Sequence, residues 1–336
     1  MEFPCRTVCI AKPLIYSELE TYLKLIPLSS TMSSLDRVKE IAEKIKSMEI
    51  RGAANIGRAA ARALMYYAED FDGNFVEEFM DGVTEARKIL ESTRPSAVTL
   101  FNAIRYVFKR MEGRDVNSLR DSVIKAAKQF IENSEKAIER IGRFGAERIP
   151  PNSTVMTHCN SSAALGAIIT AHLQGKNIEV IATETRPWYQ GHITVKRLAE
   201  EGIPVTLIVD SAMRYFMKDV DIVMVGADTV ASNGAVINKI GTSLMALCAH
   251  EARVPFIVCA ETYKFSPETV IGKLVKIEER DVREVADPKE FSGVKIRNPV
   301  FDATPPEYID AIITEKGVIS PYLAYEIIKE EFGVSL

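Results

Sequence analysis

The sequence has little of what marks a zinc protein, a secreted protein or a membrane protein. Its 336 residues contain five cysteines and four histidines, and the cysteines are not paired around histidines as in a zinc site. No stretch approaches the roughly 18 continuous apolar residues of a membrane helix. The opening residues MEFPCRTVCIAKPL lack the basic-then-apolar order of a secretory signal. We therefore expect a cytoplasmic protein with reduced thiols, no metal site and no membrane contact.

An excess of positive charge is also missing. The net charge is −4, with 47% hydrophobic and 26% charged residues, which is typical of a soluble globular protein. The acidic balance argues against nucleic-acid binding, which needs a basic face. A locally basic pocket for a phosphorylated small molecule stays open. The sequence also lacks a Walker loop and a G-x-G-x-x-G motif, so we expect no dinucleotide cofactor.

The residue pattern divides the chain into a helical part and an α/β part. Residues 33–147 carry apolar residues at helical spacing in the segments 33–69, 74–91, 97–111 and 118–147. The turn-rich stretch RIPPNST ends this pattern at residues 148–154. From there to residue 336, short β-branched runs alternate with helical stretches, which predicts a Rossmann-like parallel sheet with helices on both faces.

The two ends of the chain are harder to assign. Residues 1–32 fit neither pattern, so they are either a genuine extension or a stretch before the authentic start at Met32. Residues 266–336 are expected to add a peripheral strand and a last helix, YLAYEIIKEEF.

Reactive side chains gather where the predicted strands end. In an open parallel sheet, ligands bind outside the carboxyl ends of the strands. Each residue taken alone could be a helix cap or a loop hydrogen-bonding group, and Asp210 in particular is placed to cap the helix SAMRYF. The strand-end residues are Cys159, Glu184, Arg186, Asp210, Asp228, Glu261 and Lys264.

Cys159 is the most informative of these residues. It lies in THCNSSAA, between a strand and the start of a helix, where the helix dipole would favour a thiolate. The N–H groups of Ser161, Ser162 and Ala163 could hold a phosphate there. The alternative is a buried, inert thiol, the interpretation that suits Cys248 and Cys259, which lie in an apolar helix and an apolar strand.

Asp228 and the arginines form a second group of candidates. Enclosed by apolar neighbours, Asp228 would have a raised pKa and could donate a proton at neutral pH; the alternatives are a helix N-cap or an ion pair with Lys239. Arg51 precedes a Gly-Ala pair, and Arg94 and Arg186 each precede a proline that restrains their backbone. Fixed guanidinium groups suit oxyanions, although surface salt bridges are the alternative for each.

These motifs together resemble a known family. In order, they are RGAANIG, TRPSAV, THCNSSAA, ETRPWYQG, GADTVASNG and NKIGT, over about residues 33–336. They resemble the family of methylthioribose-1-phosphate isomerase and archaeal ribose-1,5-bisphosphate isomerase, whose fold the regulatory subunits of eukaryotic translation initiation factor 2B share. GAVINKIGT, CAETYKFSPET and FDATPPEYIDAIITEKGVISPY look most like the bisphosphate isomerase branch.

Three departures help to place the chain within the family. Methylthioribose-phosphate isomerases typically have proline inside the RGA motif, where this chain has Ala54 followed by Asn55. The initiation-factor subunits generally lack the cysteine–aspartate pair, which this chain keeps. Some bisphosphate isomerases carry lysine where Ser162 stands, so one phosphate has fewer cationic contacts here.

The resemblance implies an aldose–ketose isomerase that needs no metal or redox cofactor. It makes Cys159 the proton acceptor and Asp228 the proton donor. Implied substrate-binding residues are Arg51, Gly52, Ala53, Ala54, Arg94, Ser161, Ser162, Ala163, Asn238, Lys239 and Lys264. Ribose 1,5-bisphosphate would become ribulose 1,5-bisphosphate in AMP salvage. Family members are homo-oligomers, dimers or hexamers, and some respond to AMP. The alternatives are a methylthioribose-1-phosphate isomerase and a non-catalytic regulatory subunit.

Overall fold

The computed structural model describes residues 33–333 of the chain. The predictions about residues 1–32, including a start at Met32, lie outside these described residues. Within residues 33–333, no helix has both the length and the apolar character needed to cross a bilayer.

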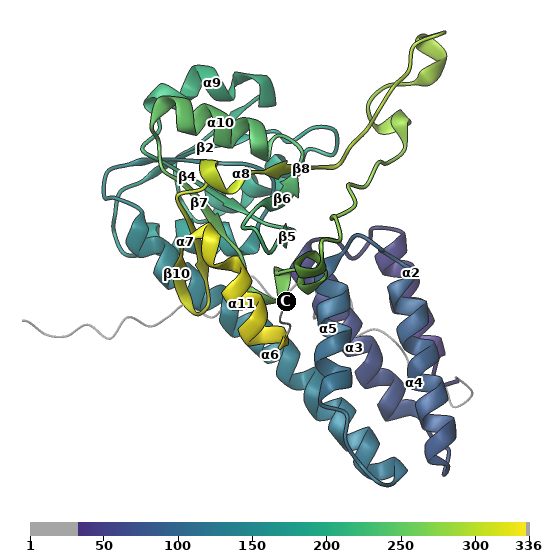
Figure 1. The fold of residues 1–336 in the computed structure, drawn as a ribbon. Helices are drawn as coiled ribbons and strands as arrows, with labels where there is room; N and C mark the ends of the chain where they lie inside the picture. The colour runs from purple at the N-terminus through teal and green to yellow at the C-terminus, as the bar shows by residue number, and fades with distance from the viewer. Residues whose placement is uncertain (1–32, 334–336) are drawn as a thin grey trace, which may run out of the picture. The chain divides into compact units, whose positions relative to one another are not determined.

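The first part of the described chain is helical (Figure 1). Its elements are α2 (Asp36–Lys46), α3 (Ala53–Asp70), α4 (Val76–Glu91), α5 (Val98–Lys109) and α6 (Val116–Arg148). Each buries one apolar stripe, as in α2, where Val38, Ile41 and Ile45 are fully buried. The segment 33–69, predicted to be helical, forms two helices with a break between α2 and α3. Gly52 takes a φ of 85° there, which favours glycine, and it starts α3 with Arg51 outside the helix.

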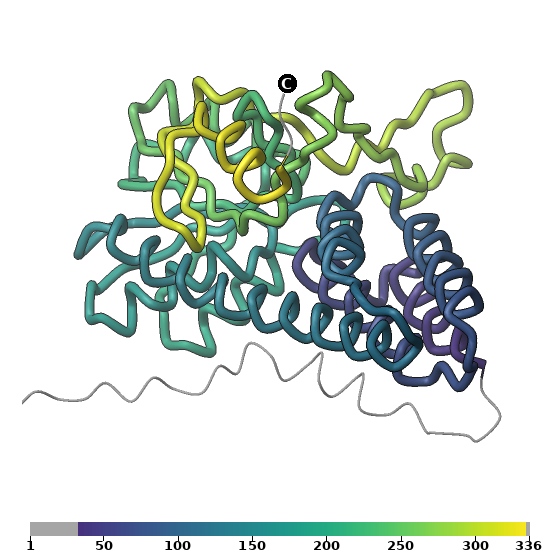
Figure 2. Tube along the Cα trace, turned by 60° about the horizontal axis from the view of Figure 1, so that its bottom comes forward, coloured from purple at the N-terminus to yellow at the C-terminus, as the bar shows by residue number. Residues whose placement is uncertain are grey.

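The longest helix, α6, links the helical part to the sheet. It begins with a capping box between Asp115 and Ser118. Phe130, in its middle, packs in the core of the helical part, whereas Ile141 and Ala146 pack against α7 (Ser162–Leu173) and the sheet. Figure 2 shows the teal helix running between the two parts. A boundary between two domains at residues 147–148 stays a prediction.

A seven-stranded sheet forms the second part. Its strands are β1 (Thr154–Thr157), β2 (Glu179–Thr183), β3 (Val205–Ile208), β4 (Ile222–Gly226), β7 (Phe256–Cys259), β9 (Ala311–Thr314) and β10 (Gly317–Ile319), in the order β10-β9-β7-β4-β1-β2-β3. All neighbouring pairs are parallel except β9 and β10. The prediction of a helical part followed by a Rossmann-like parallel sheet is confirmed.

Side chains alternate between two cores along each central strand. On β4, Val223 and Val225 join the core under α10 (Thr242–Ala252), whereas Ile222 and Met224 join the core under α6 and α7. This period of two explains why the central strands read as continuous apolar runs: both of their faces are covered by helices. The helices α8 (Gln190–Glu200), α9 (Met213–Phe216) and α11 (Ala324–Phe332) complete the second part.

Two expectations about local structure need correction. The sequence predicts a helix over NKIGTSLMALCAHEAR at residues 238–253. Asn238 and Lys239 instead end β6 (Val236–Lys239), which pairs with β5 (Thr229–Val230) and β8 (Phe301–Thr304) in a small antiparallel sheet. The C-terminal region contains three strands, β8, β9 and β10, where one peripheral strand was expected. Before β8, residues 273–300 contain short 3₁₀ turns and no long helix or strand.

Candidate active site

The candidate site lies at the carboxyl ends of two neighbouring strands. The chain passes from β1 to β2 on one side and later returns to β4 on the other side, so β1 and β4 flank the topological switch point where such sheets bind ligands. Cys159 follows β1 and Asp228 follows β4. Both line one cavity of about 170 Å³.

Every residue for which the resemblance implied a role lines this cavity. They come from the start of α3, the loop before α5, the ends of β1, β4 and β6, the start of α7 and the turn after β7. The residues are Arg51, Gly52, Ala53, Ala54, Arg94, Cys159, Ser161, Ser162, Ala163, Asp228, Asn238, Lys239 and Lys264. The fold therefore brings together residues that lie as far apart in the sequence as Arg51 and Lys264. Their individual roles stay predictions.

Three strand-end residues from the sequence analysis do not line the cavity: Glu184, Arg186 and Asp210. The Asp210 carboxylate accepts hydrogen bonds from the backbone N–H groups of Thr185 (2.8 Å) and Arg186 (2.7 Å), and makes no N-cap bond. The Arg186 guanidinium donates to Tyr189 Oη and the Val285 carbonyl oxygen. The N-cap interpretation of Asp210 is therefore wrong, because its carboxylate stabilises the turn after β2 instead.

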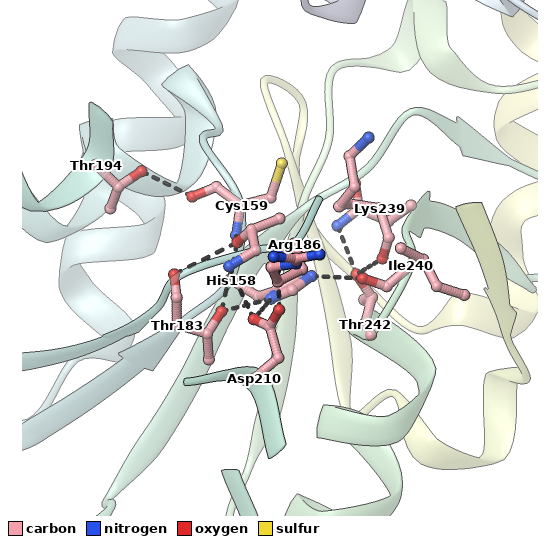
Figure 3. Close-up of polar contacts among 12 residues, drawn as sticks. His158, Cys159, Thr183, Arg186, Thr194, Asp210, Lys239, Ile240 and Thr242 are labelled. Atoms are coloured by element: carbon pink, nitrogen blue, oxygen red, sulfur yellow. Dashed lines mark hydrogen bonds and ion pairs between the residues drawn. The ribbon is translucent and has the colours of Figure 1, made fainter. Parts of the chain in front are cut away.

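A buried histidine fixes the backbone before Cys159. His158 Nε2 lies 2.8 Å from the Ile240 carbonyl oxygen, and Nδ1 lies 2.6 Å from Thr183 Oγ1. Burial lowers the pKa of His158 to about 4, so the ring is neutral at pH 7. Since a carbonyl oxygen only accepts, Nε2 carries the hydrogen and Nδ1 accepts from Thr183. The histidine thereby ties β1 to β2 and to the loop before α10 (Figure 3).

Cys159 adopts a left-handed backbone conformation with a φ of 67°. Its N–H donates to Thr185 Oγ1 (2.9 Å), and its carbonyl accepts from Thr194 Oγ1 (2.7 Å). Non-glycine residues in this region cost energy, and such strain clusters at functional sites. Figure 3 shows the sulfur pointing away from the group formed by His158, Thr183 and Asp210. The two hydrogen bonds therefore aim the thiol toward the cavity.

Burial opposes the thiolate form that was expected for Cys159. Burial raises the pKa of the thiol to about 11, and the positive charge of Lys239 offsets only part of this increase. A thiol with this pKa is protonated at neutral pH. Burial of the sulfur and the start of α7 therefore act in opposite directions on this thiol.

Alkylation kinetics test this ionisation. Iodoacetamide reacts with the thiolate, so modification of Cys159 is expected to accelerate as pH rises from 8 toward its pKa of about 11. Lys239→Gln removes a charge that lowers this pKa and should slow alkylation at a given pH. Peptide-resolved mass spectrometry separates Cys159 from Cys248; a plateau below pH 8 would contradict the assignment.

The pKa of Asp228 is set by burial and by the cations around it. Burial raises the pKa of its carboxyl group, although Lys239, Lys264, Arg94 and Arg280 act in the opposite direction. The next residue begins β5, so Asp228 is not a helix N-cap. The prediction of a raised pKa for Asp228 is confirmed in direction.

Two helix N-termini face the same cavity. Residues 52–54 at the start of α3 and residues 161–163 at the start of α7 both line it. The first N–H groups of a helix have no carbonyl partner within that helix and favour anions. Ser161 Oγ accepts a hydrogen bond from the Ala164 N–H at 3.3 Å. The backbone N–H groups of Ser162 and Ala163 are therefore the ones left for a ligand. Two such edges on one cavity suit a ligand with two anionic groups.

Gly226 leaves the space that Ser161 occupies. A Cβ atom at position 226 would lie 2.2 Å from Ser161 Oγ and 2.5 Å from its Cβ. We expect Gly226→Ala to push the α7 N-terminus away from β4, lower the free energy of unfolding by about 1–3 kcal/mol and raise KM for an anionic substrate. Denaturant unfolding and steady-state kinetics check both effects; an unchanged KM would show that the position of Ser161 does not matter. Gly175→Ala cannot serve as a matched control, because Gly175 adopts a positive φ of 77° that is strained for alanine.

Buried cations surround the acid and the thiol. Lys264 Nζ pairs with Glu261 Oε2 at 2.7 Å, and both side chains are almost fully buried. Lys239 is also buried, which lowers the pKa of its amine, and its Nζ lies 5.0 Å from the centroid of the Phe301 ring. The acidic chain thus contains a locally basic cavity, as the sequence analysis allowed.

The sequence analysis missed several lining residues. Among them are Trp188, Gln190, Lys276 and Arg280. The last two lie in the segment 273–300, where no long helix or strand gives a periodic signal. Trp188 and Gln190 lie within the quoted motif ETRPWYQG but were not singled out there.

The family model described as the Initiation factor 2 subunit family matches residues 49–321. This range includes cavity-lining residues from both the helical part and the sheet part. The chain belongs to this family.

Relatives within the family carry two kinds of name. A protein of Archaeoglobus fulgidus named ribose 1,5-bisphosphate isomerase is 58% identical over 301 residues, covering 89% of this chain and 95% of that protein. A methylthioribose-1-phosphate isomerase of Acetivibrio thermocellus is 42% identical, covering 88% and 92%. Other archaeal relatives at 54–56% identity share the first name.

A solved family structure has the same fold. The crystal structure of a Pyrococcus horikoshii protein described as translation initiation factor eIF-2B superimposes with a TM-score of 0.75 at 35% identity, covering 85% of this chain and 98% of that one. The family fold therefore carries both enzyme and initiation-factor names, and only the site can distinguish them.

Proposed function

We propose that this protein isomerises ribose 1,5-bisphosphate to ribulose 1,5-bisphosphate. The observation that carries the proposal is that Cys159 and Asp228, on neighbouring strand ends, line one cavity with two helix N-termini and buried cations. Such a cavity offers a base, an acid and two anion-binding edges. The names of the archaeal relatives at 54–58% identity support the same activity.

The chemistry explains the need for both an acid and a base. A sugar with phosphate on its anomeric oxygen cannot open its ring by ordinary mutarotation. In our mechanism, the Cys159 thiolate removes the proton from C2, and those electrons form the C1–C2 double bond. The bond between C1 and the ring oxygen breaks, and Asp228 protonates that oxygen. The resulting enol phosphate loses the proton of its C2 hydroxyl and gains one at C1, giving the ketose with both phosphates retained.

The resting protonation states fit this mechanism in part. Burial raises the pKa of Asp228, which is the direction that a proton donor needs. Cys159 must first lose its proton, and Lys239 is the neighbouring charge that lowers the thiol pKa. The step moves protons only between the protein, the substrate and water, so no oxidant or reductant enters.

The remaining expectations extend this proposal. Residues at the starts of α3 and α7, with Arg94, Asn238, Lys239 and Lys264, bind the two phosphates and the sugar hydroxyls. The ketose product would feed a carboxylase in an AMP-salvage route, with AMP as an activator. The protein would act in the cytoplasm as a homo-oligomer.

One assay tests the proposal against both alternatives. Purified protein is offered ribose 1,5-bisphosphate and methylthioribose 1-phosphate, with and without AMP, and ketose formation is followed by phosphorus or carbon NMR. We expect turnover of the bisphosphate. Turnover of the methylthio sugar alone would assign the second activity, and turnover of neither would favour a regulatory subunit.

A further inference from the structure

The segment 273–300 contributes a cationic side chain to the cavity from outside the sheet. Both Figure 1 and Figure 2 show this light-green stretch as an excursion that leaves the sheet part and returns to it at β8. Its two ends pair with each other: the Arg280 N–H donates to the Asn298 carbonyl oxygen (3.0 Å), and the Val300 N–H donates to that of Glu278 (2.9 Å). Arg280 is therefore anchored at the base of the excursion, next to β8.

A shared carboxylate holds Arg280 against an arginine of the helical part. Glu278 accepts from Arg280 Nε at 3.1 Å, from Arg94 Nη2 at 3.0 Å and from Ser96 Oγ at 2.9 Å. Two guanidinium groups and one carboxylate leave one net positive charge at this point of the cavity wall. Trp188 lies beside the cluster, with its ring centroid 5.9 Å from Arg280 Cζ.

The cluster leaves two buried donors without partners. The side chains of Arg280 and Arg94 are 10% and 11% exposed. Arg280 Nη1 and Arg94 Nε are buried and make no hydrogen bond. A buried donor without a partner is unfavourable, and native proteins rarely keep one without a reason. Both residues line the cavity, so a ligand with phosphoryl oxygens would supply the missing acceptors.

We infer that Arg280 is a substrate-binding residue that contacts a phosphoryl oxygen together with Arg94, and that Glu278 is the positioning residue for both. This inference rests on the proposed function and adds a cation that the sequence motifs do not include. A substrate with an apolar group in place of one phosphate would leave the two donors unpaired, so the cluster favours a bisphosphate.

The test uses Arg280→Gln, Arg280→Lys and the matched control Arg283→Gln. Arg283 lies three residues along in the same segment, but its side chain is 76% exposed and pairs with Asp281. We expect Arg280→Gln to raise KM for ribose 1,5-bisphosphate roughly 10- to 150-fold, the range for a hydrogen bond to a charged group, with a smaller change in kcat. Arg280→Lys should recover part of the loss, and Arg283→Gln should match the wild type.

Calorimetric titration with inorganic phosphate gives a readout that does not depend on turnover. Weaker phosphate binding in Arg280→Gln, with normal binding in Arg283→Gln, supports the inference. Equal binding and equal KM in Arg280→Gln and wild type overturn it, as does a loss confined to kcat that lysine does not restore. If Arg280→Gln does not fold, Arg280→Lys decides, because an unchanged KM there contradicts a contact that depends on the guanidinium Nη1. Wild-type protein without any isomerase activity overturns the proposed function instead, and the phosphate titration still tests the anion site.

Discussion

Replacing Cys159 with serine is expected to lower kcat for ribose 1,5-bisphosphate by about 100- to 10,000-fold, the usual contribution of a positioned base. A serine hydroxyl is far less acidic than a thiol, so it cannot supply the anion that removes the C2 proton. The substitution changes one atom. The hydrogen bonds that hold residue 159 come from its backbone, to Thr185 and Thr194, and therefore stay in place. We expect KM and the melting temperature to change little.

Cys248→Ser is the matched control for this experiment. Cys248 lies on α10, is 5% exposed and does not line the cavity. Ketose formation by NMR should be normal in this variant, and thermal unfolding should show that both variants are folded. A Cys159→Ser protein with wild-type kcat would remove the thiol from the mechanism, and the site would then need another base.

The sequence predicts the central sheet well because its strands are buried on both faces. The runs that became β1, β2, β4 and β7 are short, apolar and separated by helical stretches, so local pattern and tertiary environment agree. The small sheet was missed because β5 has only two residues and because β6 ends in the polar residues Asn238 and Lys239, so neither stands out as an apolar run. Lys239 was therefore predicted in a helix, whereas it ends a strand.

The candidate site was also predicted only in part from the sequence. The strand-end rule identified Cys159, Asp228 and Lys264, because carboxyl ends of parallel strands meet at one edge whatever the intervening loops do. The ionisation of Cys159 could not be predicted, since it depends on how completely other residues bury the sulfur. The Arg94–Glu278 pair joins positions 184 residues apart, and neither the spacing nor the composition of the segment 273–300 indicates it.

Asp228→Asn is the second substitution with a large expected effect. Asparagine keeps the size of the side chain but has no carboxylic proton, so the ring oxygen would leave without an acid. We expect kcat to fall by about 100- to 10,000-fold and KM to change less. Asp219→Asn, an exposed aspartate, should behave as wild type in the same NMR assay and serves as the matched control.

Deuterium exchange separates proton donation by Asp228 from a general electrostatic role. In the closed ring, C2 has no adjacent carbonyl group, so its hydrogen becomes acidic only as the bond between C1 and the ring oxygen breaks. Without the acid at position 228, both events should fail together, and Asp228→Asn incubated with substrate in deuterium oxide should show neither ketose nor exchange at C2. Exchange at C2 without ketose would mean that Cys159 acts before ring opening. Wild-type turnover would mean that another group, with Lys239 the nearest candidate by its charge coupling to Asp228, donates the proton.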